Sequence, residues 1–190
     1  SYDNIATSLE HPTQESVVTA EASENQLVLA GPGSGKTRVI VHRIAYLIRV
    51  CGFDPAGIVA LAYNRSAAYE VRRRLRDLVN EDARFVRVLT LHGLAAELTG
   101  SLPDVADLGT NQTDDAFREL IERAAERLET GSLDGSGGAA RERLLAGCSH
   151  LLLDEYQDID AGQARLVTAL SGRLVEDGRK LSVLAVGDDD

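Results

Sequence analysis

A glycine-rich stretch near the N-terminus contains the residue types that bind phosphate groups. Its glycines allow backbone N–H groups to turn toward a phosphate, and Lys36 can bridge two phosphates of a nucleotide. The hydroxyl of Thr37 can ligate Mg²⁺. An apolar run precedes the stretch and an amphipathic segment follows it, which favours a phosphate-binding loop over a glycine-rich turn with a surface lysine. The predicted nucleotide-binding residues are Ala30, which replaces the glycine of the strict pattern, and Gly31, Pro32, Gly33, Ser34, Gly35, Lys36 and Thr37.

A pair of carboxylates follows a second apolar run. Asp154 and Glu155 come directly after Leu151-Leu152-Leu153. Alone, such a pair is more often a solvated strand end. Beside a phosphate-binding loop, we expect Asp154 to hold Mg²⁺ through water and Glu155 to accept a proton from an attacking water. The two motifs together predict a Mg²⁺-dependent ATPase whose catalytic residues are Lys36 and Glu155.

The elements that must position these residues alternate along the chain. Each short apolar run predicts a strand, and each longer segment with apolar residues at helical spacing predicts a helix. Strands that are apolar throughout belong to parallel sheets covered on both faces, so we predict a three-layer α/β/α fold with a mainly parallel sheet. Strands are expected at 26–30, 58–62, 86–89, 150–154 and 181–186, and helices at 37–50, 66–79, 113–129 and 161–174.

Composition narrows the class of protein. The chain has 190 residues, of which 44% are hydrophobic, and a formal net charge of −10. These values predict a globular domain with no membrane partner, because no apolar run approaches the ~18 residues of a membrane span. Cys51 and Cys148 lie far apart, without metal-binding spacing, so we expect a reducing, cytoplasmic compartment. The chain lacks an initial methionine and ends in an acidic run, which suggests a fragment of a longer protein.

The acidic pair after the second apolar run belongs to a longer and more specific pattern. The string Asp154-Glu155-Tyr156-Gln157-Asp158 resembles motif II of superfamily 1 DNA helicases of the UvrD/Rep type. Four further segments resemble motifs of that family in the same order, and together they cover nearly the whole chain except 100–148. The resemblance implies a RecA-like P-loop NTPase fold, ATP and Mg²⁺ as cofactors, and 3′ to 5′ movement on single-stranded DNA. It also places Gln157 among the nucleotide-binding residues.

The segment before the phosphate loop resembles the motif that reads adenine in this family. By that resemblance Gln14, in His11-Pro12-Thr13-Gln14, recognises the base; otherwise it is a solvated or capping residue of a helix start. Arg38 follows the loop as in these helicases and is expected near the nucleotide. An ordinary first-turn arginine is the alternative.

Two segments resemble the DNA-contacting motifs Ia and Ib. Tyr63 falls on the aromatic position of motif Ia, where a ring can stack on a base, and Asn64 and Arg65 follow it. Thr90 and His92 occupy the motif Ib positions by resemblance. The alternatives are a buried strand-end aromatic for Tyr63 and a hydrogen-bonded structural histidine for His92.

The resemblance also predicts an organisation. We expect a RecA-like core over 1–99, a reduced 1B-like helical insertion with a glycine-rich linker over 100–148, and the rest of the core over 149–190, which ends at the start of motif III. The partners would be single-stranded DNA and the remaining helicase domains of a parent chain. Two alternatives stay open: an ATPase acting on a non-nucleic-acid partner, and a nucleotide-dependent interaction module that does not unwind DNA.

Overall fold

The computed structural model describes most of the chain. The described residues are 5, 8–9, 11–31, 33–100, 110–130, 145–176 and 181–188. Pro32 of the predicted phosphate loop and the predicted glycine-rich linker lie outside them. Among the described residues, none of the helices combines the length and apolar character needed to cross a membrane.

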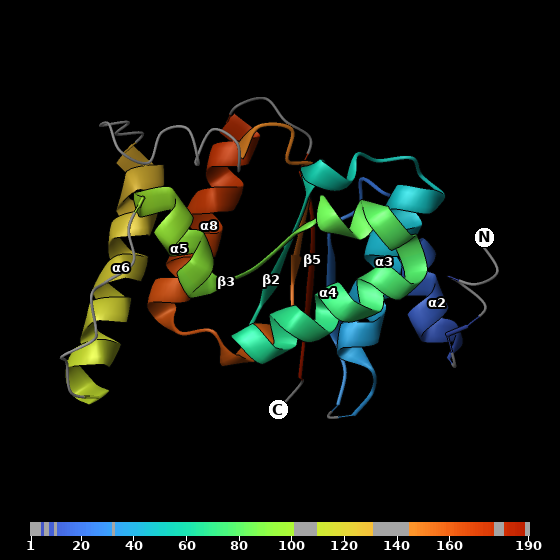
Figure 1. Ribbon diagram of the computed structural model, residues 1–190, viewed down its shortest axis with the longest axis horizontal. Helices are drawn as coiled ribbons and strands as arrows, with labels where there is room; N and C mark the ends of the chain where they lie inside the picture. Colours follow the sequence, from blue (N-terminus) through green and yellow to red (C-terminus); the bar gives the residue numbers. More distant parts are fainter. Residues whose placement is uncertain are drawn as a thin grey trace. The chain divides into compact units, whose positions relative to one another are not determined.

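Five strands form one sheet, and helices fill the connections (Figure 1). The strand order is β1-β5-β4-β2-β3, and the pairs β1–β5, β5–β4 and β4–β2 are parallel. The predicted α/β class with a parallel sheet is therefore confirmed. The strands are β1 (Gln26–Leu29), β2 (Ile58–Ala62), β3 (Arg87–Thr90), β4 (His150–Leu153) and β5 (Ser182–Gly187), and the main helices are α2 (Pro12–Thr19), α3 (Lys36–Arg49), α4 (Arg65–Val79), α5 (Leu91–Thr99), α6 (Thr110–Thr130) and α8 (Ala161–Glu176).

The expected elements match the observed ones to within a few residues. The strand 58–62 is observed as predicted, and the helix expected at 37–50 runs over Lys36–Arg49. The largest shift is in α6, which starts at Thr110 rather than 113. The polar run Thr110–Thr113 lacks the apolar periodicity on which the prediction depended, so its helical turn was not visible in the pattern.

The chain divides into two compact units. The first comprises 1–89, 148–158 and 180–190, and the second 90–147 and 159–179. The predicted boundaries at 99/100 and 148/149 come from the family resemblance, and the insertion over 100–148 stays a prediction.

The core of the first unit is built from the sheet and from helices α3 and α4. All five residues of β2 and all four of β4 are buried, as expected for central strands of a parallel sheet. Leu152 aligns with Ala60 on one side and with Leu184 on the other. Since β1, β2, β4 and β5 point the same way, the residues that follow them meet at one edge of the sheet, where α/β proteins place their ligands.

The second unit contains α5, α6 and α8. Helix α6 packs against both α5 and α8 through Leu120, Ile121, Ala124, Ala125 and Leu128, which are buried. Arg127 of α6 donates to the carbonyl oxygens of Leu98 and Thr99 at the C-terminal end of α5, at 3.4 and 3.0 Å. Glu129 and Arg165 form an ion pair of 2.6 Å between α6 and α8.

Candidate functional site

The phosphate loop leaves β1 and turns into α3 within a few residues. Ala30 N–H donates to the Gly187 carbonyl at 3.0 Å, which ties the start of the loop to the end of β5. Gly33 and Gly35 have φ values of 76° and 83°, in the left-handed region that favours glycine. Gly35 is the N-cap of α3. The backbone N–H groups of the first turn of α3 are therefore available to an anion.

Lys36 is buried and surrounded by acceptors. Its side chain pairs with the carboxylate of Asp188, and its Nζ lies 3.8 Å from Glu155 Oε2 and 3.5 Å from the Ala30 carbonyl oxygen. The hydrogen bond to Asp188 raises the pKa of Lys36 against the opposing effect of burial. The ammonium thus stays charged at neutral pH.

Thr37 and Asp154 meet at the predicted metal position. Thr37 Oγ1 donates to Asp154 Oδ2 at 3.0 Å, and the Asp154 residue is only 5% exposed. Burial raises the pKa of Asp154, while the Thr37 hydrogen bond lowers it. A hydroxyl and a carboxylate are the hard oxygen donors that Mg²⁺ takes from a protein when phosphates and water supply the rest. The residues present therefore fit a Mg²⁺ ion.

Glu155 is held by its neighbours in an unusual backbone conformation. Its φ of 53° is one of two positive values among the described non-glycine residues. Such strain persists only where the surroundings over-determine it, and it is frequent at active sites. Gln157 Nε2 donates to Glu155 Oε2 at 2.8 Å, and Gln157 Oε1 accepts from Asp188 N–H at 2.8 Å. Gln157 therefore links Glu155 to the end of β5.

A polar cavity of about 590 Å³ joins these residues to the predicted DNA motif. Carboxylates from the ends of β4 and β5 line one part of it, and the residues after β2 line another. The lining residues are Thr37, Tyr63, Asn64, Ala67, Asp154, Glu155, Gln157, Asp158 and Asp188.

Gln14 borders a second, apolar cavity of about 250 Å³. Its Nε2 donates to the Ser34 carbonyl at 2.6 Å, and its buried Oε1 has no hydrogen-bond partner among the described residues. The cavity walls are mainly apolar and include Val17, Val28 and Val39. This oxygen is buried in the observed conformation, so a flat group in the cavity would satisfy it once the Gln14 amide rotates toward that group. Arg38 donates instead to the Ser8 carbonyl, so its predicted place near the nucleotide stays a prediction.

The predicted DNA residues of the first unit lie at the surface. Tyr63 is 49% exposed, so the alternative of a buried strand-end aromatic is wrong. Asn64 caps α4, because its Oδ1 accepts from Ala67 N–H at 2.8 Å. Arg65 is exposed in the first turn of the same helix.

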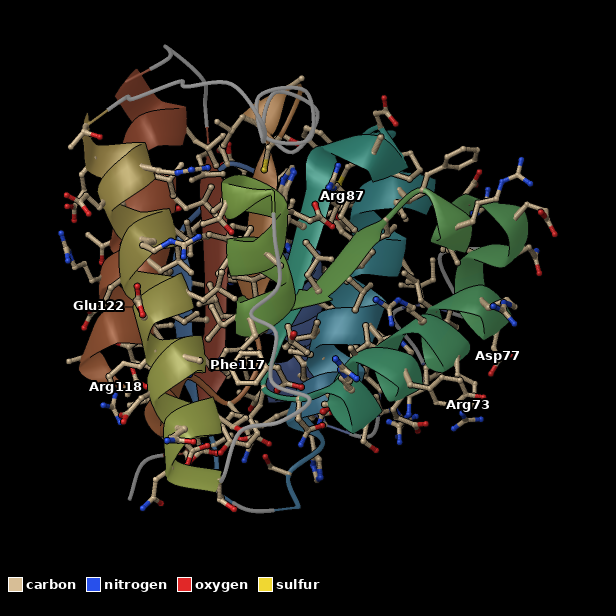
Figure 2. The ribbon with its side chains drawn as sticks, turned by 60° about the vertical axis from the view of Figure 1, so that its left-hand side comes forward. Arg73, Asp77, Arg87, Phe117, Arg118 and Glu122 are labelled. Carbon is tan, nitrogen blue, oxygen red and sulfur yellow. The ribbon has the colours of Figure 1, made fainter. Side chains whose placement is uncertain are left out.

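The other two predicted DNA residues belong to the second unit and make structural contacts there. Thr90 caps α5 by accepting from Gly93 N–H at 3.0 Å. The ring of His92 packs edge-on against Phe117 of α6, with 5.0 Å between centroids (Figure 2 labels Phe117). Burial lowers the pKa of His92. These contacts support the structural alternative for His92, and its DNA role stays a prediction.

Sequence reasoning did not single out Asp188 as a member of the site. Asp188 lies in the C-terminal segment that resembles the start of motif III, and the structure pairs it with Lys36 and with Gln157. The sequence contained one usable signal. An aspartate that directly follows the last residue of an apolar strand sits at the same sheet edge as the phosphate loop.

Comparisons with known proteins agree with this geometry. The family model for the UvrD/REP helicase N-terminal domain matches residues 10–108 and 106–190. The chain is 47% identical over 85 residues to DNA helicase II of Escherichia coli (45% of this chain and 12% of the relative). It is 38% identical over 88 residues to the ATP-dependent DNA helicase Rep of Buchnera aphidicola subsp. Baizongia pistaciae (46% and 13%).

A longer match is to the ATP-dependent DNA helicase PcrA of Leuconostoc citreum, at 34% identity over 128 residues (67% and 16%). The chain thus matches only a small part of each of these relatives. Because the family model covers most of the chain, the chain belongs to the UvrD/REP helicase N-terminal domain family.

Proposed function

We propose that this chain is the first motor domain of an ATP-dependent DNA helicase, which binds MgATP and moves 3′ to 5′ on single-stranded DNA together with further domains of its parent protein. One observation carries the proposal. The phosphate loop after β1 and the acidic pair after β4 converge through the 3.0 Å hydrogen bond between Thr37 and Asp154. The names of the relatives support DNA as the substrate.

In this proposal the phosphates of ATP lie at the start of α3. The N–H groups at the N-terminal end of the helix and the Lys36 ammonium attract them. Thr37 and Asp154 would hold Mg²⁺, which supplies charge neutralisation between the phosphates when it is bound. The polar cavity beside Thr37 has room for these groups.

Glu155 is the proposed general base. Its carboxylate lines the polar cavity with Thr37 and Asp154, where it can accept a proton from a water aligned with the γ-phosphate. Gln157 orients that carboxylate through its 2.8 Å hydrogen bond. The positive charge that stabilises the transition state from the opposite side would come from the second RecA-like domain.

Gln14 is the proposed reader of the base. An amide side chain can pair with the N6/N7 edge of adenine, and a rotation of the Gln14 amide would let its unpartnered Oε1 accept from the exocyclic amino group. The apolar walls of the cavity suit the faces of a purine ring. This arrangement favours ATP over nucleotides that have a carbonyl at the same ring position.

The surface residues after β2 are the proposed start of the DNA track. Tyr63 would stack on a base, and Asn64 and Arg65 would bind backbone phosphates. Tyr63 and Asn64 line the same cavity as Glu155 and Gln157, which supports coupling between DNA contact and hydrolysis.

Nucleotide binding tests the ATP part of the proposal. We expect Lys36→Ala to weaken binding of a fluorescent ATP analogue in the presence of Mg²⁺ by about 10-fold to 100-fold, because a charged hydrogen-bond donor is lost. Arg118→Ala, at an exposed position of α6 (Figure 2), is the control and should bind as the unmodified chain does. Equal affinities of both variants would contradict the phosphate site.

The general base is tested in the full-length parent protein. Glu155→Gln should keep nucleotide binding and lower DNA-stimulated turnover by about 100-fold or more. Unchanged turnover would show that another group takes the proton.

DNA binding is tested with a matched pair of tyrosines. Tyr63→Ala should weaken binding of a labelled single-stranded oligonucleotide by about 5-fold to 150-fold, the range of one stacking contact. Tyr69, which is 66% exposed on α4, is the control, and Tyr69→Ala should leave the affinity unchanged. Equal effects at both positions would show that Tyr63 makes no specific contact with DNA. Turnover without any response to DNA would favour an ATPase with a non-nucleic-acid partner.

A further inference from the structure

Arg43 of α3 is a buried cation that donates to backbone carbonyls. It is only 2% exposed. Its Nη1 donates to the carbonyl oxygens of Val18 and Ala20, at 2.8 and 2.6 Å, and its Nη2 donates to that of Glu21 at 2.9 Å. Burying a guanidinium is costly unless its donors are satisfied, so these bonds fix where the side chain and its partners lie.

The three carbonyls belong to the C-terminal end of α2 and the residues after it. The last carbonyls of a helix have no partner within the helix, and a cation near them also interacts favourably with the helix dipole. Helix α2 has eight residues, with no basic residue in its last turn and Val18 as its one buried residue. A helix this short is not stable alone, and α2 has little apolar surface with which to dock. Arg43 therefore supplies both its C-terminal cap and its attachment to α3.

The attachment determines where Gln14 points. Gln14 and Val18 are four residues apart in α2, so they lie on the same face of the helix. A rotation or shift of the C-terminal end of α2 therefore moves the Gln14 amide relative to Ser34 and the apolar cavity. The Gln14 amide also lies close to the phosphate loop, because a Cβ at Gly35 would lie 3.1 Å from Gln14 Nε2.

Two further residues of α3 hold the segment before α2. His42 Nδ1 lies 2.6 Å from the Ile5 carbonyl oxygen, so this nitrogen carries the proton and donates, and Arg38 donates to the Ser8 carbonyl. Helix α3 begins at the phosphate loop, and Arg43 follows Lys36 by two helical turns, about 10 Å along the axis. One helix thus carries both the phosphate site and the anchor of the base-reading segment.

We propose that Arg43 is a positioning residue for nucleobase selectivity, which holds the C-terminal end of α2 so that Gln14 faces the base. This inference rests on the proposed role of Gln14. Arg43 itself touches no part of the nucleotide in this proposal, so phosphate affinity depends on it far less than base discrimination does.

The test compares the affinities of the chain for fluorescent ATP and GTP analogues with Mg²⁺. The unmodified chain should prefer ATP by about 10-fold to 100-fold, because guanine presents a carbonyl where adenine presents an amino group to Gln14. Gln14→Ala should abolish the preference. Arg43→Gln should reduce it to about 3-fold or less, mainly by weakening ATP binding, and Arg43→Lys should give an intermediate value.

A purely structural role predicts a different result. Leu75→Ala in α4, at a fully buried position outside the α2–α3 pair, is the control for general destabilisation and should keep the preference. Hydrogen exchange gives a second measurement that needs no nucleotide. Arg43→Lys should speed exchange of the α2 amides and leave those of α4 unchanged.

The failures of the two proposals are distinguishable. A normal ATP preference in both Arg43 variants, with slow exchange in α2, would overturn the positioning role and leave the role of Gln14 intact. No preference in the unmodified chain would contradict the role of Gln14 and this inference together, while a loss of binding in Lys36→Ala would still support the phosphate site.

Discussion

Replacing Gly187 with alanine is expected to destabilise the end of β5 through one side chain, that of Gln157. A Cβ at Gly187 would lie 2.7 Å from Gln157 Oε1, 3.3 Å from the Gln157 backbone nitrogen and 3.4 Å from Tyr156 Cβ. The φ of Gly187 is outside the left-handed region, so the cost comes from space and not from backbone strain. The amide of Gln157 must therefore move away.

The displacement removes the bonds of Gln157 to Glu155 and to Asp188 N–H. Each hydrogen bond contributes about 0.5–1.5 kcal/mol. The remaining crowding against the backbone adds about 1 kcal/mol. We therefore expect Gly187→Ala to lower the free energy of unfolding by about 2–4 kcal/mol.

Urea unfolding followed by circular dichroism measures this change, with one common dependence of the free energy on urea concentration for both proteins. Gly172→Ala is the control, because Gly172 is exposed within α8 and a Cβ there would meet nothing within 4 Å. Alanine in a helix interior should raise the free energy of unfolding by about 0.5–1 kcal/mol.

A double-mutant cycle identifies the clashing group. In a Gln157→Ala background the amide is already gone, so Gly187→Ala should cost only about 1 kcal/mol. The same cost in both backgrounds would refute the reasoning, because the clash would then not involve the Gln157 side chain.

Three further predictions concern pH and helix caps. Burial lowers the pKa values of His42, His92 and His150 below 6.5, so the unfolded chain binds more protons near that pH. The free energy of unfolding should therefore fall as the pH drops from about 7 to about 5. Urea unfolding at several pH values should show a smaller fall in His42→Gln than in the unmodified chain. Asn64→Ala should cost about 1 kcal/mol through loss of the α4 cap, whereas Asn64→Asp should keep stability and weaken DNA binding by charge. Thr90→Ala should cost a similar amount in thermal unfolding and Thr90→Ser much less, so a DNA defect in Thr90→Ser would point to a direct contact.

Most of the fold could be predicted because the strands are short apolar runs with clear ends. Helix α3 and strand β2 follow patterns that arise from local spacing alone. The phosphate loop was visible for the same reason, since its glycines, Lys36 and Thr37 are adjacent in the chain.

The contacts that complete the site join residues far apart in the sequence. Asp188 and Lys36 are 152 positions apart, and their pairing depends on β5 lying beside β1. The role of Arg43 was also hidden, because an arginine in an apolar helix pattern does not reveal which carbonyls it will reach. Tyr63 could be buried or exposed at a strand end, and only the structure decides between these.

The pairing of Lys36 with Asp188 also affects how nucleotide affinity should be understood. The ammonium already has a carboxylate partner before a phosphate arrives, so nucleotide binding exchanges one anion for another. The free energy gained at Lys36 is then a difference between two ion pairs, which is much smaller than the attraction of an isolated cation. Both ion pairs form at a buried lysine, and salt screens buried charge pairs much less than exposed ones. The affinity for ATP should for this reason depend less on ionic strength than the charge of the triphosphate suggests.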